Sequence, residues 1–88
     1  MYYTYVLECM DAQKNKTFYV GSSANLKERV LAHKSKSTQT TKKFDLIELV
    51  YYEACLSKKD AIRREHQLKT GFGRGYIKRR LEDYLKRD

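Results

Sequence analysis

Two stretches near the N-terminus are rich in aromatic and β-branched residues, and a short polar segment separates them. Residues 2–9 read YYTYVLEC and residues 17–21 read TFYVG, with the segment MDAQKNK between them. Aromatic and β-branched residues favour strands, and a short polar connection between two strands favours a hairpin. The start of the chain is therefore predicted to fold as a two-stranded antiparallel hairpin.

This hairpin predicts that two tyrosines are near neighbours. With the turn centred near residues 12 and 13, residue 5 pairs with one of residues 19–21. Side chains alternate between the two faces of a strand, so odd residues of both strands share a face. We therefore expect Tyr5 and Tyr19 to lie side by side on one face.

A helix is expected after the hairpin. Leu26 and Val30 form its apolar stripe, and the helix ends at about His33. Its N-cap is expected to be Ser22 or Ser23, because serine accepts hydrogen bonds from the first free backbone N–H groups of a helix.

The middle of the chain reads as loop, strand and helix. KSKSTQTTKK, residues 34–43, is polar and basic without periodicity, which indicates a loop. The aliphatic and aromatic segment 44–53 predicts a third strand. Ser57 followed by Asp60 resembles a capping box, and the helix that it opens is expected to run through Lys69.

A last helix is expected at the C-terminal end. The glycines of the stretch GFGR, residues 71–74, are expected to end the preceding helix. From Gly75 onward the apolar positions recur at helical spacing, and the other face of this helix is basic. Those positions are Tyr76, Ile77, Leu81, Tyr84 and Leu85.

These elements predict an α+β fold, with a small three-stranded antiparallel sheet flanked by helices in the order β-β-α-β-α-α. A chain of 88 residues has room for one domain, so residues 1–88 are expected to form a single domain.

The charge of the chain points to a polyanionic partner. Nineteen Lys and Arg residues stand against 11 Asp and Glu residues, a formal net charge of +8. Nucleic acid is the first candidate. A membrane surface is the alternative, but no segment has the low overall polarity, with Trp, Phe and Leu on one side, that a basic membrane-surface helix would show. No apolar run approaches the ~20 residues of a membrane span. We expect a cytoplasmic monomer with a nucleic-acid partner.

Glu65 interrupts an otherwise apolar stripe on the helix after Ser57. The inward positions of that helix are expected to be Ala61, Ile62, Glu65, Leu68 and Lys69. A carboxylate on such a face needs a partner, because burial of an unpaired charge is costly. Two explanations stand side by side: an ion pair with a neighbouring cation, or a catalytic or metal-binding role.

Arg29 and His33 lie one turn apart on the first expected helix, so their side chains can reach a common point. The alternative is a solvated helix edge, with the histidine placed favourably at the C-terminal end of the helix dipole. Gly21 likewise has two explanations, the end of a strand or a place where the backbone of a substrate approaches closely.

Taken together, these positions resemble the GIY-YIG nuclease family, in particular its small stand-alone members, which are similar to the nuclease domain of the excision-repair subunit UvrC. Tyr3-Thr4-Tyr5 stands where the family has Gly-Ile-Tyr, and Tyr19-Val20-Gly21 stands where it has Tyr-Ile-Gly. The remaining matching positions are Arg29, His33 and Glu65.

The resemblance implies a metal-dependent endonuclease that hydrolyses DNA phosphodiester bonds, in DNA repair or processing. It implies that Glu65 binds Mg²⁺ or Mn²⁺ and that Arg29 holds the phosphate oxygens. Tyr5 would deprotonate or orient the attacking water, which requires its pKa to fall from about 10. Tyr19 would position the water, and His33 would relay a proton or act as an alternative base.

Nucleic-acid contacts are expected from a backbone-tracking surface of basic side chains with little base readout. The expected residues are Gly21, where the backbone of a substrate can approach closely, and the cations Lys27, Lys34, Lys42, Lys43, Lys69, Arg74, Lys78 and Arg79. The rival hypothesis is a binding module without catalysis, in which the tyrosines and Glu65 are structural and the same surface holds nucleic acid or a protein.

Overall fold

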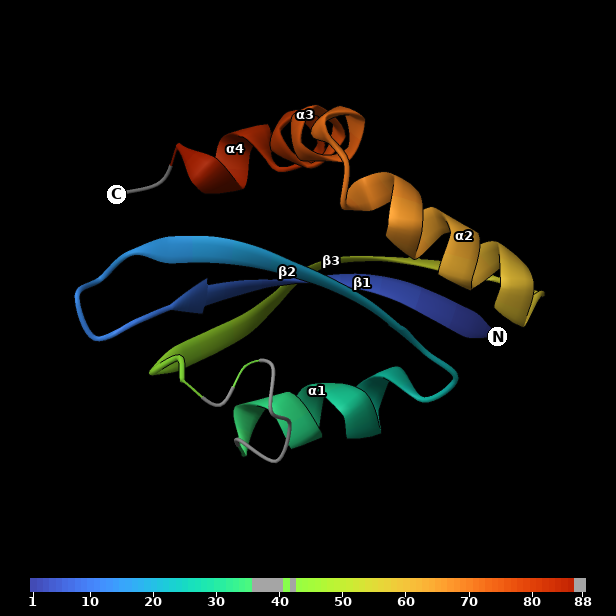
Figure 1. Cartoon of the computed structure of the whole chain (residues 1–88), viewed down its shortest axis with the longest axis horizontal. Coiled ribbons are helices and arrows are strands. Elements are labelled where there is room, and N and C mark those ends of the chain that lie inside the picture. Colours follow the sequence, from blue (N-terminus) through green and yellow to red (C-terminus); the bar gives the residue numbers. More distant parts are fainter. Residues whose placement is uncertain (36–40, 42, 87–88) are drawn as a thin grey trace.

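A computed structural model describes residues 1–35, 41 and 43–86. Its sheet has three antiparallel strands, β1 (Tyr2–Met10), β2 (Lys16–Ser23) and β3 (Leu46–Cys55), in the order β2-β1-β3. The predicted α+β class and the three-stranded antiparallel sheet are confirmed. β1 is the central strand. Most of its residues are buried, because a strand flanks it on each side and helices cover both faces of the sheet (Figure 1).

The hairpin between β1 and β2 has the predicted register. Tyr5 pairs with Gly21 and Leu7 pairs with Tyr19, so Tyr5 and Tyr19 share one face of the sheet. The side chain of Asp11 shapes the turn by accepting hydrogen bonds from the backbone N–H groups of Gln13 and Asn15, both at 2.9 Å.

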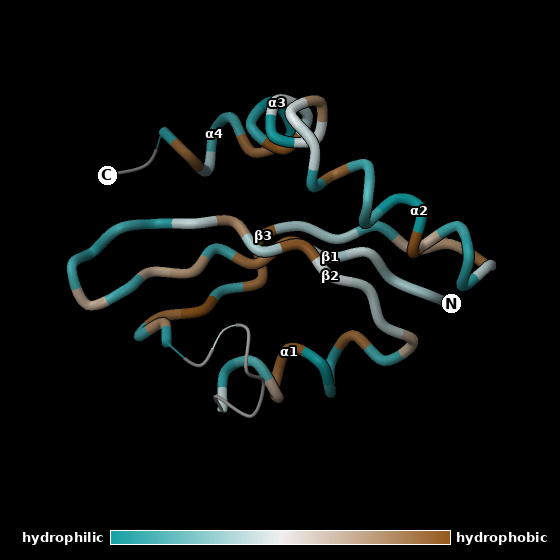
Figure 2. Tube along the Cα trace, viewed as in Figure 1, coloured by the Kyte–Doolittle hydropathy of each residue, from teal (hydrophilic) through white to brown (hydrophobic). Residues whose placement is uncertain are grey.

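Helices cover both faces of the sheet (Figure 1). One face holds α1 (Leu26–Lys34), and the other holds α2 (Lys58–Leu68), α3 (Gly71–Arg80) and the short α4 (Glu82–Leu85). Figure 2 shows hydrophilic and hydrophobic residues alternating along these helices, as expected for helices with one side on the sheet and the other in solvent.

Two hydrophobic cores result from the alternation along β1. Tyr5, Leu7 and Cys9 face α1 and pack with Phe44 and Ile47. Val6 faces the opposite side, where the core is completed by residues from β2, α2 and the C-terminal helices, namely Val20, Leu68, Ile77 and Leu81. Successive residues of one strand therefore supply both cores of this small domain.

The helix caps differ from the prediction. Asn25 caps α1, with its side chain accepting from the backbone N–H of Glu28 at 3.1 Å, whereas Ser22 and Ser23 still belong to β2. Ser57 is the N-cap of α2 but makes no side-chain cap hydrogen bond to the described residues. Asp60 pairs instead with Arg63 at 2.8 Å, so the capping box does not form.

The inward face of α2 is also rotated relative to the prediction. Ala61 and Leu68 are buried, but Ile62 is 39% exposed. The small side chain of Ala61 allows α2 to approach β1 closely, where the Thr4 hydroxyl donates to the Ala61 carbonyl at 2.8 Å. This contact places Ala61 at the centre of the buried stripe and turns Ile62 outward.

The glycine-rich stretch at residues 71–74 forms the first turn of α3 and does not simply end α2. Thr70 caps α3, with its hydroxyl accepting from the backbone N–H of Gly73 at 3.4 Å. A Cβ at Gly73 would overlap the backbone of Leu68, so glycine permits the close packing of α3 against the end of α2. The final helix is split at Leu81 into α3 and α4.

Candidate active site

The hydroxyl group of Tyr5 lies at the centre of a polar cluster between the sheet and α1. It lies 3.0 Å from Nε2 of His33 and accepts a hydrogen bond from Nε of Arg29 at 3.3 Å. The Tyr5 side chain is 1% exposed. Arg29 and His33 are one helical turn apart, so α1 delivers both side chains to the same hydroxyl group.

His33 is fully buried and uses both ring nitrogens. Its Nδ1 lies 2.7 Å from the hydroxyl oxygen of Thr41. Burial, together with the charge of Arg29, holds the pKa of His33 below its ordinary value, so the ring is neutral at neutral pH. In the tautomer whose Nδ1–H donates to Thr41, Nε2 is the acceptor for the Tyr5 proton.

Tyr19 completes the cluster from β2. Its half-buried ring packs edge-to-face against His33, with the ring centroids 5.2 Å apart. The ring of Tyr5 packs against the same imidazole at 5.8 Å. The hydrogen bond from Arg29 to Tyr5 raises the pKa of Arg29 most strongly, and Tyr19 raises it further. The guanidinium therefore keeps its charge. The structure therefore brings Tyr5, Tyr19, Arg29 and His33 together.

Gly21 has a packing role in this cluster. It is buried and lies opposite Tyr5 in the hairpin, and a Cβ at this position would overlap the Tyr5 hydroxyl. Gly21 thus leaves room for the side chain of Tyr5. This packing role explains a glycine at position 21 even if Gly21 does not contact DNA.

The pKa of Tyr5 shifts in the direction opposite to the sequence-based expectation. Burial raises the pKa of Tyr5, and this effect outweighs the lowering by the hydrogen bond and charge of Arg29. The charge of Glu65 raises it further. The expected fall was wrong because one exposed cation does not compensate for the loss of water around a phenolate.

Glu65 reaches the site from α2. Its Oε1 accepts a hydrogen bond from the Ser22 hydroxyl at 2.7 Å, and its Oε2 pairs with Nζ of Lys69 at 2.7 Å. Burial raises the pKa of Glu65, but the hydrogen bonds from Lys69 and Ser22, together with the charges of Lys69 and His66, outweigh it, so its pKa is lowered and it is ionised at neutral pH. The ion-pair explanation from the sequence is therefore confirmed. The charge of Glu65 also acts on Tyr5, and a catalytic or metal-binding role of Glu65 stays a prediction.

The donor set at Glu65 suits a hard divalent cation that keeps most of its waters. Among the described residues, no three His, Cys, Asp or Glu side chains come together as a metal centre. Mg²⁺ is often held by one or two carboxylates plus phosphate oxygens, so a single carboxylate fits it. Lys69 is the competitor, but its side chain is half exposed, and exposed ion pairs four residues apart on a helix are weak.

The predicted nucleic-acid contacts fall on two sides of the molecule. Lys27 and Lys34 are exposed on α1, on one face of the sheet. The exposed residues Lys69, Arg74, Lys78 and Arg79 follow the end of α2 and α3, on the other face. Lys43 is exposed beside the ring of Phe44, and Lys42 lies outside the described residues.

Two residues of the site were not predicted. Thr41 lies in a segment without periodicity, and nothing in the local sequence indicates its contact with His33. Ser22 was interpreted as a possible helix cap. Its hydroxyl directly follows the motif Tyr19-Val20-Gly21, and this position was the available signal for a contact with Glu65.

A family model confirms the resemblance on which this site was predicted. The GIY-YIG catalytic domain matches residues 1–80. The chain belongs to the GIY-YIG family. GIY-YIG domains are nuclease domains, so the family implies a nucleic-acid substrate and, in general, a divalent metal.

Small stand-alone proteins are the relatives of this GIY-YIG chain. It is 34% identical to a UPF0213 protein of Staphylococcus haemolyticus over 70 residues, which are 78% of this chain and 80% of the relative. A UPF0213 protein of Natronomonas pharaonis is 36% identical over 70 residues, 78% of each chain. A UPF0213 protein of Pediococcus acidilactici is 38% identical over 72 residues, 77% of this chain and 68% of the relative. No solved structure matches significantly.

In the described part of this GIY-YIG chain, no helix is long and apolar enough to cross a membrane.

Proposed function

We propose that this GIY-YIG protein is a metal-dependent endonuclease that hydrolyses phosphodiester bonds of DNA. The observation that carries the proposal is the convergence of Arg29 and His33 on the hydroxyl group of Tyr5, at 3.3 and 3.0 Å. Such a cluster combines a fixed positive charge with a route for a proton, and phosphodiester hydrolysis needs both.

Arg29 is proposed to bind the phosphate that is attacked. Its guanidinium is exposed on α1 and remains charged, so it can contact non-bridging oxygens while Nε stays on Tyr5. Charge accumulates on those oxygens in the transition state, and a preorganised cation stabilises them at that moment.

Tyr5 and His33 are proposed to move the proton of the attacking water together. Because the pKa of Tyr5 is raised, the phenolate is not its resting state. The neutral His33 can accept the Tyr5 proton while the Tyr5 oxygen takes a proton from the water, and Thr41 holds the imidazole in the required tautomer. Tyr19, which is more exposed, is proposed to orient the water.

Glu65 is proposed to hold Mg²⁺ or Mn²⁺, with Ser22 orienting the carboxylate. When bound, the cation would supply charge stabilisation at the leaving oxygen. Lys69 must leave Oε2 for this to happen, and its half-exposed side chain has the freedom to do so.

The second candidate function is a nucleic-acid-binding module without catalysis. The ion pair between Glu65 and Lys69 favours it, because a carboxylate held by an ammonium group is a poorer metal ligand. The same basic surface would then bind DNA through its phosphates alone.

Cleavage assays on two variants separate these functions. Labelled single-stranded, duplex and branched DNA are incubated with wild-type protein in Mg²⁺, in Mn²⁺ and in a chelator. If the protein is a nuclease, wild-type protein should cleave DNA only in the presence of metal. Glu65→Gln should abolish this cleavage and keep the affinity for DNA. A wild-type protein that binds all three forms and cuts none of them in either metal supports the binding module instead.

A further inference from the structure

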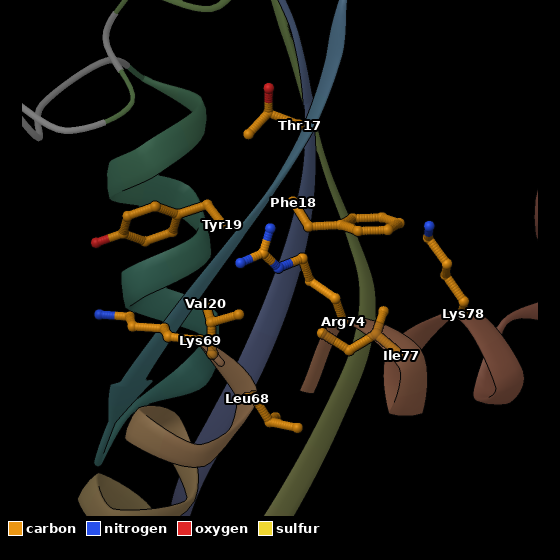
Figure 3. A pocket seen from close by; sticks show the side chains of 9 residues that line it. All are labelled: Thr17, Phe18, Tyr19, Val20, Leu68, Lys69, Arg74, Ile77 and Lys78. Atoms are coloured by element: carbon orange, nitrogen blue, oxygen red, sulfur yellow. The ribbon is translucent and has the colours of Figure 1, made fainter. Parts of the chain in front are cut away.

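A groove runs along the outer edge of β2, between this strand and the helices α2 and α3. It has a volume of about 390 Å³. Figure 3 shows its lining, with Arg74 reaching across the middle and Lys78 at one side. β2 is an edge strand, so no further strand covers this part of the sheet within the described chain.

The groove combines an apolar floor with a cationic rim. Val20, Leu68 and Ile77 are buried and belong to the core beneath it, and the half-buried ring of Phe18 packs against that core. The cations Lys69, Arg74 and Lys78 are all exposed at its edges. An apolar floor suits a base or a sugar, and the rim suits the phosphates on either side of it.

The groove borders the candidate active site through two of its lining residues. Tyr19 borders it, and the ring of Tyr19 also packs against His33. Lys69 borders it as well, and its ammonium group pairs with Glu65. In Figure 3 the side chains of Tyr19 and Lys69 extend toward the side of α1. A strand that lies in the groove therefore passes Tyr19 and also Lys69, the ion-pair partner of Glu65.

We infer that this groove holds one unpaired nucleotide of the DNA strand, next to the phosphate that is cut. In a duplex the flat faces of the bases are stacked inside the helix, and a protein surface meets phosphates, sugars and base edges. An unpaired nucleotide offers the face of its base, which packs on Phe18 while Arg74 and Lys78 hold its phosphates. The inference rests on the proposed function and adds a preference for DNA with single-stranded segments.

The test measures binding without cleavage. Fluorescence anisotropy in a chelator gives the dissociation constants of a blunt duplex and of the same duplex with a single-stranded overhang. Phe18→Leu keeps the apolar volume in the core but removes the aromatic face, and Arg74→Ala removes a rim cation. Phe72→Leu is the control for the first variant, because Phe72 is a 60% exposed aromatic of α3 outside the groove. Lys59→Ala, an exposed cation of α2, is the control for the second.

Wild-type protein is expected to bind the overhang duplex more tightly than the blunt duplex. Phe18→Leu should weaken overhang binding roughly tenfold and leave blunt-duplex binding nearly unchanged. Arg74→Ala should lower the salt dependence of overhang binding by about 0.7 in the log–log slope, without the same change for the blunt duplex. Both control variants should bind like the wild type.

Equal losses on both DNA forms, or no loss with Phe18→Leu at an unchanged melting temperature, would overturn the inference. These outcomes do not depend on catalysis. A wild-type protein that cuts DNA but shows no overhang preference would refute nucleotide binding in the groove and support the proposed nuclease activity. An overhang preference without any cleavage would refute the nuclease activity and support nucleotide binding in the groove.

Discussion

The hydroxyl group of Tyr5 lies directly against Gly21, its partner across the hairpin, with no room between them for a Cβ atom. The register of the β1–β2 hairpin places a glycine opposite Tyr5. This pairing leaves the Tyr5 hydroxyl the room that it needs to contact His33 and Arg29.

Gly21→Ala is expected to displace the Tyr5 hydroxyl from His33 and Arg29. Overpacking at a buried site costs about 1–3 kcal/mol, so the melting temperature should fall, and cleavage should fall with it. Thermal unfolding and a cleavage assay on the same samples check this. Gly71→Ala is the control, because a Cβ there would meet no described atom within 4 Å. Equal stability of the two variants would contradict the packing role of Gly21.

Arg29→Ala is expected to lower the rate of DNA cleavage by about 100-fold or more, because a preorganised charge at the transition state is lost. Its effect on the free energy of unfolding should be about 0.5–1.5 kcal/mol, because one hydrogen bond to Tyr5 is lost while Arg29 itself is exposed. Single-turnover cleavage and chemical denaturation measure the two effects. Arg63→Ala, which removes an exposed arginine of α2, should change neither quantity. A large stability loss with unchanged cleavage would instead make Arg29 a structural residue.

Acidification is expected to destabilise the protein through His33. Burial and Arg29 hold the pKa of His33 below its ordinary value of about 6.5, so the unfolded chain binds the proton more readily. This stabilising contribution is therefore fully present above about pH 6.5 and is lost as the pH falls through the pKa of the folded state.

Melting temperatures measured from about pH 7.5 down to about pH 5 check the contribution of His33. His33→Gln should flatten the curve in this range, whereas His66→Gln, at an exposed position of α2, should leave its shape unchanged. The same slope in wild-type protein and His33→Gln would refute the assignment.

Lys69→Gln is expected to tighten metal binding at Glu65. The ammonium group 2.7 Å from Oε2 competes with a cation for the carboxylate, and removal of a neighbouring charge is worth about 1 kcal/mol, or about fivefold in affinity, even at high dielectric. The binding of Mn²⁺ to the free protein, followed by electron paramagnetic resonance, measures this. Lys86→Gln is the matched control, because Lys86 also pairs with a glutamate four residues before it. An unchanged Mn²⁺ affinity would place the metal elsewhere.

The aromatic and β-branched stretches predicted the hairpin because strand preference and side-chain alternation are local properties. The shared face of Tyr5 and Tyr19 followed from the period of two residues along a strand, and the spacing of Arg29 and His33 followed from the turn of a helix. The same local patterns misplaced the cap of α1 and the start of α3. Asn25 and Thr70 are the N-caps of α1 and α3 because β2 and α2 end just before them.

The sequence by itself thus determined the class of fold, the family and the chemical groups that can meet. Only the tertiary structure decided how those groups are held. Ser22 contacts Glu65 across 43 residues of sequence, and Thr41 reaches His33 from a segment without periodicity. Burial reversed the expected direction of the Tyr5 pKa. Desolvation and hydrogen bonding depend on everything that surrounds an atom in space, and a local sequence pattern describes only its neighbours along the chain.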